Sequence, residues 1–344
     1  MNTQTIDYQS QSYNYAGLFT LALRLVVGWT YFSAFWRRVA LTNKLDPETA
    51  GYIGEKFNHF LPNALGIKPI IEYLVTHPDA LLWAMVAFTI IEGIVGLMMM
   101  LGFFTRLMSI GVFGLAMGIL LGSGWIGTTC LDEWQIGVLG IATGFTIFFT
   151  GSGRYSIDYL LAKKKPELTN KKWFRLLGSG VLPIAPNHLH KLVFAGSMFI
   201  LFMTLMTNQV FHGGVWGTLH NKSVKPKIEI ADVQLLDDAL SFEIFRVEGA
   251  DVYGSFLIGI DVTDENGQPI VELDGEDLAA FPVNNIDNAY VAKVKPGPHS
   301  LIIPLGAKAT IELDGPQWSN LPSGKYTLTL TDISGAQWTS VVVK

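Results

Sequence analysis

The chain has one cysteine, Cys130, and the thiolate form of a cysteine is a nucleophile. Two adjacent arginines, Arg37 and Arg38, follow the first long apolar segment. Guanidinium groups bind oxyanions such as sulfonates, and a thiol close to an arginine is more strongly ionised. If these three side chains meet, they form an anion site with a reactive sulfur. The alternative is that Cys130 is an inert small residue.

Two charged residues, Arg24 and Glu92, lie inside long apolar segments. Charges are costly within a membrane and usually face a partner or a cavity. Arg24 lies ~12 Å and Glu92 ~18 Å from the inner ends of their segments, at a rise of about 1.5 Å per residue. Long side chains can span this difference, so we expect an ion pair that ties the first two helices together. The alternative is a group that binds a proton or a quinone inside the bundle.

The elements that carry these residues are apolar segments long enough to cross a bilayer, which takes about 20 residues. Few charges interrupt them, in a chain that is 49% apolar and only 15% charged. Such runs are too many for the buried helices of a soluble protein. They predict transmembrane helices at five places: 16–35, 80–104, 107–126, 134–150 and 192–210.

Lysines and arginines predict the orientation of these helices, because cytoplasmic loops carry an excess of them. Eight lie between residues 154 and 191, and five lie in the loop 36–79. The larger group is expected in the cytoplasm, which places the N-terminus inside and the loops 36–79 and 127–133 outside. Arg37, Arg38 and Cys130 then share the outer membrane face. The loop 36–79 is expected to cover the outer mouth of the bundle with two short helices, 49–61 and 68–76.

A change in composition near residue 215 marks a second domain, since residues 1–220 carry a net charge of +4 and residues 221–344 one of −9. Short runs rich in β-branched and aromatic residues, separated by turn signals, predict an antiparallel, all-β, Ig-like sandwich. We expect this domain to cap the bundle or to mediate homodimers. The predicted strands are 227–235, 239–247, 252–263, 289–294, 300–303, 310–313, 326–331 and 338–343.

These features predict a multi-pass protein of the cell membrane with four parts. The parts are a four-helix membrane domain (1–165), a basic cytoplasmic linker (166–191), a fifth transmembrane helix (192–212) and an extracytoplasmic β-sandwich (213–344).

Composition and motifs exclude several classes of function. A formal charge of −5 argues against a nucleic-acid-binding protein. One cysteine cannot build a Cys-based zinc or iron–sulfur site, and the seven histidines are scattered. The sequence has no haem-attachment, flavin or P-loop pattern, so no bound metal, flavin or haem is expected. Any redox chemistry must therefore use organic electron carriers in the membrane.

Several motifs resemble the DoxX/DoxD membrane family: LRLVVG at 23–28, EGIVG at 92–96, LGFFTR at 101–106 and GSGRYSID at 151–158. The later helix and β-domain resemble DoxA. The whole chain thus resembles a DoxD–DoxA fusion of the thiosulfate:quinone oxidoreductase type. The resemblance implies that two thiosulfate ions are joined to tetrathionate while a membrane quinone is reduced, which could be ubiquinone, menaquinone or caldariellaquinone.

With thiosulfate and quinone as the substrates that the resemblance implies, we assign each candidate residue an expected role. Cys130 is the expected catalytic residue, through a cysteinyl S-thiosulfonate intermediate. The residues expected to bind thiosulfate are Arg37, Arg38 and Trp125. Those expected to bind quinone or to relay protons are Arg24, Glu92, Trp134, Asp132 and Glu133. The motif residues Arg106, Arg154 and Asp158 face the cytoplasm and are expected to pair charges between the inner turns.

Two other functions compete with this interpretation. A non-enzymatic transporter or membrane scaffold, with the outer domain binding a partner, predicts that Cys130 is dispensable and that the purified protein has no turnover. An enzyme that acts on another thiol or sulfur oxyanion would use the same site.

Overall fold

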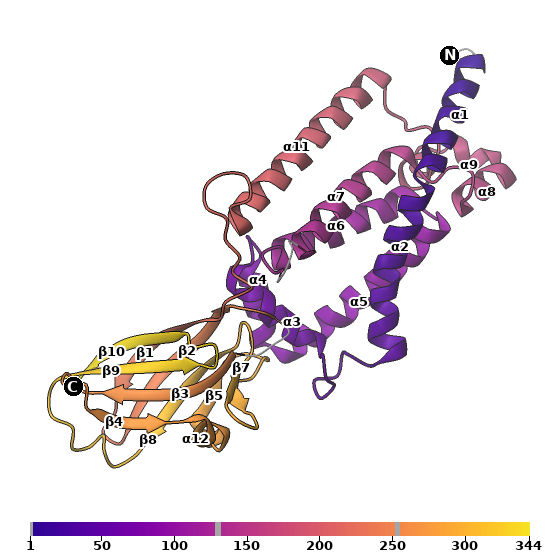
Figure 1. Ribbon diagram of the computed structural model, residues 1–344. Coiled ribbons are helices and arrows are strands. Elements are labelled where there is room, and N and C mark those ends of the chain that lie inside the picture. Colours follow the sequence, from indigo (N-terminus) through magenta and orange to yellow (C-terminus); the bar gives the residue numbers. More distant parts are fainter. Residues whose placement is uncertain (1–2, 128–131, 252–254) are drawn as a thin grey trace. The chain divides into compact units, whose positions relative to one another are not determined.

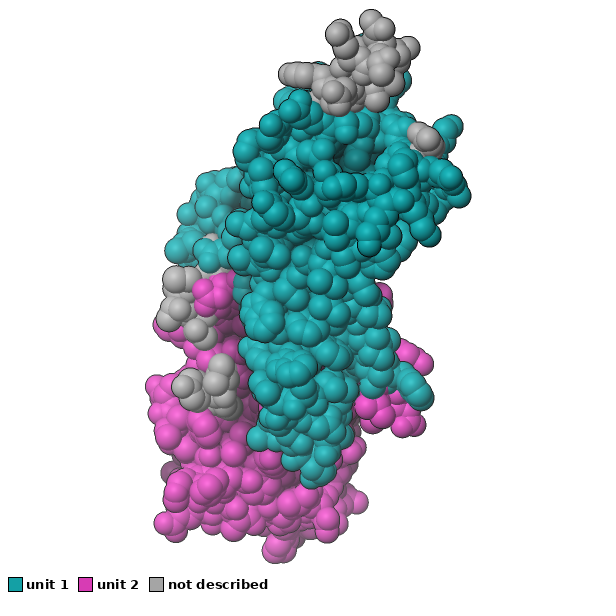
Figure 2. All heavy atoms as spheres, turned by 90° about the vertical axis from the view of Figure 1, so that its right-hand side faces the viewer, with its two compact units in different colours: residues 1–50, 83–124, 133–220 teal, residues 51–82, 125–132, 221–344 magenta. Residues whose placement is uncertain are grey.

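The computed structural model describes residues 3–127, 132–251 and 255–344 of the chain (Figure 1). The chain forms two compact units, which Figure 2 shows in different colours. The helical unit comprises Met1–Ala50, Trp83–Gly124 and Glu133–His220. The β unit comprises Gly51–Leu82, Trp125–Asp132 and Asn221–Lys344.

Four long helices close into a bundle in the helical unit: α2 (Leu21–Trp36), α5 (Pro78–Leu101), α6 (Thr105–Ser123) and α7 (Asp132–Thr150). Their shared core contains Tyr31 of α2, Val95 and Met99 of α5, Leu115 of α6 and Ile147 of α7. The apolar sequence of each helix therefore has a buried stripe towards its neighbours. Large apolar side chains are also exposed on each of these helices, as expected for helices that face lipid.

Glycines allow these helices to approach one another closely. A Cβ atom on Gly144 of α7 would lie 2.8 Å from the backbone oxygen of Ser109 and 2.9 Å from the backbone nitrogen of Phe113, both on α6. A Cβ atom on Gly96 of α5 would overlap with the backbone nitrogen of Phe32 on α2. Small residues at such positions are the usual means of packing membrane helices, because dispersion contacts replace the hydrophobic effect there.

We expect Gly144→Ala to destabilise the helical unit by about 1–3 kcal/mol, because α7 must move away from α6 to make room for the methyl group. Gly118→Ala on α6 is the matched control, since a Cβ atom there meets nothing within 4 Å. Thermal unfolding in detergent, followed by circular dichroism, measures both. Equal melting temperatures for the two variants would contradict this account of the α6–α7 contact.

Three helices of the described residues are long and apolar enough to cross a membrane: α5, α6 and α11 (Pro186–His212). A bent pair, α1 (Thr3–Phe19) with α2, raises the number to four at most. The predicted span 134–150 is present as α7 but is not among them. The polar residues Asp132, Glu133 and Gln135 at its start lower its mean hydropathy.

The first predicted helix, 16–35, is wrong in two details. The chain bends by 54° between Ser10–Phe19 and Leu21–Leu41. Thr20 stands at the bend, where its hydroxyl donates to the carbonyl of Ala16 and lies 3.2 Å from the hydroxyl of Thr150. Side-chain bonds of this kind compete with the helix backbone and favour bending. Beyond Trp36 the helix continues as the π-helix η1 (Arg37–Leu41), so both arginines lie on a helix rather than in a loop.

The basic segment after α7 is helical in part. It contains α8 (Ile157–Lys164), α9 (Pro166–Asn170) and α10 (Lys172–Leu177) before α11 begins at Pro186. Ser156 caps α8 by accepting from the backbone of Tyr159. None of the residues in the most apolar window of α11 is buried, although Trp134 of α7 donates to the hydroxyl of Thr207 on α11 at 3.0 Å.

The C-terminal part is all-β, as the sequence predicts. One antiparallel sheet has the order β1-β2-β8-β5, and the other has the order β10-β9-β3-β7-β6 with β4 paired to β3. Alternating side chains of both sheets, such as Phe242 and Ile244 of β2 and Leu328 and Leu330 of β9, form one core. The strands are β1 (Lys227–Leu235), β2 (Ala239–Glu248), β3 (Ser255–Thr263), β4 (Pro269–Leu273), β5 (Ile286–Asn288), β6 (Lys295–Pro296), β7 (Leu301–Ile303), β8 (Lys308–Asp314), β9 (Lys325–Asp332) and β10 (Gln337–Val343).

The predicted strand 289–294 is wrong, because side chains take the place of a neighbouring strand there. The amide of Val294 donates to the side chain of Asn288, and the amide of Ala292 donates to the side chain of Asn58. The sequence also missed β4 and the short helix α12 (Gly275–Ala279), which Asp274 and Asp277 cap reciprocally. The start of the predicted strand 252–263 lies partly outside the described residues.

Two helices of the first loop belong to the β unit: α3 (Ile53–Phe60) and α4 (Lys68–Thr76). Asn58 on α3 donates to the carbonyl of Gly306 and accepts from Ala292. Tyr290 packs among the apolar residues of the loop, and its hydroxyl donates to Glu72 on α4 at 3.1 Å. This loop therefore folds with the β-domain as one body.

Candidate functional site

The polar centre of the helical unit is an ion pair between Arg38 and Glu92. Arg38 donates to the carboxylate of Glu92 from η1, and its guanidinium lies 5.8 Å from the ring centre of Phe88. The Glu92 side chain is only 4% exposed, whereas that of Arg38 is 23% exposed. The pair thus joins a carboxylate in the bundle interior to a cation that still reaches the surface.

Two further buried polar side chains lie near Glu92, and neither is among the site residues predicted from the sequence. Thr89 stands one turn before Glu92 on α5, is fully buried, and its hydroxyl has no hydrogen-bond partner among the described residues. Tyr31 of α2 is buried in the bundle core together with Val95 of α5, which lies three residues after Glu92. The spacing of Thr89 and Glu92 by three residues was the signal, because it puts both on one helix face.

The predicted ion pair between Arg24 and Glu92 is wrong. Arg24 is buried, and it donates to the backbone carbonyls of Ser152 and Tyr155, the first at 3.1 Å. Both residues are buried inside the bundle, but Glu92 pairs with Arg38, which lies on the helical continuation of α2. Arg37 is exposed, and its Nε donates to the carbonyl of Ser33 on its own helix.

Trp125 is fully buried in the β unit, where its indole donates to the carbonyl of Phe60 at 3.2 Å. The next residues belong to the same network: the Ser223 hydroxyl lies 2.9 Å from the nitrogen and 2.6 Å from the oxygen of Gly127. An indole without exposed surface offers no face for stacking. Its predicted role in binding thiosulfate stays a prediction, and this burial argues against it.

The remaining candidates lie around the start of α7. Asp132 is exposed, and Glu133 and Trp134 are half-buried. The side chain of Trp134 is partly exposed, and its indole N–H donates to the hydroxyl of Thr207 on α11. Cys130 lies outside the described residues, so its predicted approach to Arg37 and Arg38 stays a prediction.

Models of two known protein families match different parts of the chain. The model of the family described as the TQO small subunit DoxD matches residues 19–193, just over half of the chain. The chain belongs to the DoxD family. The model described as the TQO small subunit DoxA matches residues 211–341, so both families lie on one chain, as in a DoxD–DoxA fusion. TQO denotes thiosulfate:quinone oxidoreductase. No solved structure matches the chain.

The two family matches do not follow the two compact units. The DoxD match includes the loop Gly51–Leu82 and the segment 125–127, which fold into the β unit with the DoxA part. Asn63 of the loop donates to the carbonyl of Val247 and accepts from Lys222. The DoxD and DoxA parts thus share a hydrogen-bonded body.

The family motifs of the DoxD part hold the turns of the bundle together. Asp158 accepts from the backbone of Phe104 and Thr105 and from the hydroxyls of Thr105 and Ser179. Arg106 donates to the carbonyls of Phe148, Arg175 and Gly180. For Arg106 and Asp158, the expected charge pairing is therefore replaced by hydrogen bonds to backbone groups and hydroxyls. Among the described residues, no group of three or more His, Asp or Glu is arranged to hold a metal ion.

His59 of the DoxD loop is a buried group that titrates. It is 7% exposed, and its Nδ1 has no hydrogen-bond partner among the described residues. Burial, followed by the charge of Lys56, lowers its pKa to about 3; Asp251 opposes this effect and Arg246 adds to it. The folded β unit therefore keeps His59 neutral.

We expect the β unit to lose stability as the pH falls from about 6.5, the ordinary pKa of histidine, because the unfolded chain binds a proton that folded His59 rejects. Each unit by which the pKa is lowered corresponds to about 1.4 kcal/mol once this proton is bound. His59→Gln should flatten the dependence of melting temperature on pH between pH 7 and 4. His299→Gln, at an exposed position of the same unit, is the control and should leave the dependence unchanged. Identical pH profiles for His59→Gln and the wild type would refute the assignment.

Proposed function

We propose that the chain oxidises two thiosulfate ions to tetrathionate and transfers the two electrons to a membrane quinone. The observation that carries this proposal is the presence of the DoxD and DoxA families, both described as TQO subunits, on one chain. The apolar helices agree with a substrate that is dissolved in the membrane.

The proposed reaction has two steps at Cys130. In the first, the thiolate and the sulfane sulfur of thiosulfate form an S–S bond and give up two electrons. The quinone takes these electrons and two protons to become the quinol. In the second, the sulfane sulfur of another thiosulfate attacks the sulfane sulfur of the cysteinyl S-thiosulfonate. The S–S bond to Cys130 breaks, tetrathionate leaves and the thiolate returns. This is thiol–disulfide exchange, in which the leaving group must be a stable thiolate.

Arginines supply the charge that two dianions require. Arg37 is exposed and Arg38 is partly exposed, so their guanidinium groups are accessible to a sulfonate. Glu92, bonded to Arg38, is the proposed proton carrier on the route to the quinone, with Asp132 and Glu133 as the other candidates. The half-buried ring of Trp134 fits stacking by a quinone that approaches from the lipid.

The proposed topology keeps the N-terminus in the cytoplasm and the β-domain outside, which requires five crossings and therefore includes α7 as a membrane span beside the four that meet the length and hydropathy requirement. Two observations support it. The basic segment 154–191 belongs entirely to the helical unit. The loop Gly51–Leu82 and the segment 125–127, both proposed to be outside, are hydrogen-bonded to the β-domain.

The test is quinone reduction by the purified full chain in detergent, with thiosulfate as the electron donor. We expect one quinol for each tetrathionate formed, with ubiquinone, menaquinone or caldariellaquinone analogues as acceptors. A folded protein without turnover on any of these acceptors would favour the transporter or scaffold instead. Faster turnover with another thiol or sulfur oxyanion would change the substrate but keep the enzyme.

A further inference from the structure

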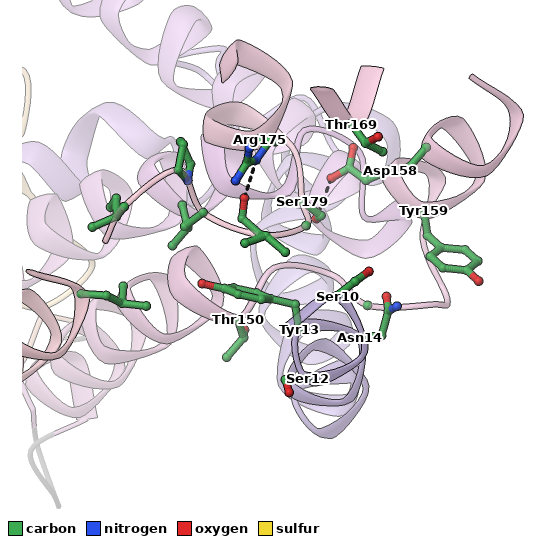
Figure 3. A pocket seen from close by; sticks show the side chains of 18 of the residues that line it. Ser10, Ser12, Tyr13, Asn14, Thr150, Asp158, Tyr159, Thr169, Arg175 and Ser179 are labelled. Atoms are coloured by element: carbon green, nitrogen blue, oxygen red, sulfur yellow. Dashed lines mark hydrogen bonds between the residues drawn. The ribbon is translucent and has the colours of Figure 1, made fainter. Parts of the chain in front are cut away.

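The helical unit contains a cavity of about 1000 Å³ that no step of the proposed reaction uses. Its walls come from α1, α8 and the segment between α10 and α11 (Figure 3). Figure 3 shows Ser10, Tyr13 and Asn14 of α1 on one side of it and Arg175 and Ser179 on the other.

One part of the wall is polar and the other is apolar. Lys163 and Arg175 contribute two cations, and α1 contributes hydroxyl and amide groups. The run 181–186 and Leu189, where α11 starts, contribute aliphatic side chains and prolines. Asp158, the acidic residue of the lining, has its oxygens occupied by donors from Phe104, Thr105 and Ser179. A ligand that fits must therefore have an anionic head and an apolar body.

The cavity is too far from the proposed redox site to hold the reacting quinone. Thr150 lines the cavity and contacts Thr20, which stands at the start of α2. Arg38 lies 18 residues further along this helix, or about 27 Å at 1.5 Å per residue. We expect no series of redox groups between the two places that could carry electrons over this distance. Electrons from a sulfur compound near Arg38 would therefore not reach a quinone ring in the cavity.

We propose that this cavity binds the headgroup of an anionic phospholipid, with the acyl chains along the apolar wall towards α11. Its volume is at the upper end of the usual range for small-molecule sites, about 300–1,000 Å³, and accommodates a phosphoglycerol group with the first part of its chains. Six further cations of the segment 154–191 favour an anionic headgroup over a zwitterionic one. The bound lipid fixes α1 and the start of α11 against the end of the bundle.

The full chain is reconstituted in equal amounts of phosphatidylglycerol and phosphatidylcholine with identical acyl chains, extracted in mild detergent, and the retained lipid is measured by mass spectrometry. We expect phosphatidylglycerol to predominate. Lys163→Gln should lower the ratio of the two lipids about fivefold, since a lysine near an anionic lipid is worth about 1 kcal/mol. Lys172→Gln is the matched control, because Lys172 is exposed on the same basic segment but does not line the cavity.

A second variant, Ala162→Trp, fills the cavity without a change of charge and should release the lipid. Equal effects of Lys163→Gln and Lys172→Gln, or full retention of lipid by Ala162→Trp, would overturn the proposal, because the attraction would then be that of the whole basic surface. Glycerol 1-phosphate added in excess should not displace the lipid; displacement would assign the cavity to a free phosphate compound instead.

Discussion

Replacing Cys130 by alanine should reduce thiosulfate-dependent quinone reduction by more than about 10³-fold, on the scale observed when enzymes lose their nucleophile. The physical reason is that the proposed path needs a sulfur atom that forms and then leaves an S–S bond, and the chain has no second cysteine to replace it. The measurement is quinol formation by the purified wild type and variant at equal concentration, with tetrathionate quantified in parallel.

Cys130→Ser is the conservative companion variant, because its hydroxyl has nearly the shape of the thiol but is a poor leaving group. It should be as inactive as Cys130→Ala while both variants melt at the temperature of the wild type. Mass spectrometry of wild-type protein with thiosulfate and quinone, quenched in acid, should show the added mass of an S-thiosulfonate, absent from both variants. Full turnover by Cys130→Ala would refute the covalent intermediate and leave direct coupling of two bound thiosulfate ions.

The apolar segments were predictable because their physical requirement is simple. A bilayer demands about 20 apolar residues, and the helices α5, α6 and α11 meet this requirement. The strands of the C-terminal part were predictable for a similar reason, since alternating burial leaves a period of two in the sequence. These patterns do not predict which residues form hydrogen bonds or ion pairs with one another.

The charged residues of the bundle illustrate this limit. Arg24 and Glu92 could be placed at suitable depths, but the choice of partner depended on features that no periodicity encodes. One is the continuation of α2 as a π-helix, which places Arg38 within hydrogen-bond distance of Glu92. The other is the irregular chain after α7, which presents the carbonyls of Ser152 and Tyr155 to Arg24.

The loop Gly51–Leu82 shows the same limit for domain organisation. The sequence predicted its two short helices, which are present as α3 and α4. Their packing on the β-domain depends on Asn58 and Tyr290, residues more than 200 positions apart that neither composition nor spacing connects. Because residues 289–294 contact this loop, they do not pair with a neighbouring strand. A strand prediction based on β-branched residues therefore failed where two side chains, Asn58 on the distant helix α3 and the nearby Asn288, accept the backbone hydrogen bonds.

The second large effect is expected at the pair of Arg38 and Glu92. Arg38→Ala should destabilise the helical unit by about 3–5 kcal/mol, because it leaves a buried carboxylate without its cation. The double variant Arg38→Ala/Glu92→Gln should regain most of this loss, since no buried charge remains. Arg37→Ala is the control for stability and should cost less than about 1 kcal/mol, because Arg37 is exposed. Thermal unfolding in detergent measures all of these variants.

Activity of the same variants separates two roles of Arg38. If its guanidinium binds thiosulfate, the double variant stays inactive although its stability is restored, and the KM for thiosulfate rises in any residual activity. If Arg38 serves only to hold Glu92 in place, the double variant should behave like Glu92→Gln alone, with the same lowered kcat and an unchanged KM for thiosulfate. Glu92→Gln alone adds the third comparison, because it removes the proposed proton carrier while the arginine remains. It should lower kcat, whereas the KM for thiosulfate should stay near that of the wild type. A double variant with wild-type kcat and KM would exclude both residues from the reaction and restrict its chemistry to Arg37 and the residues around Cys130.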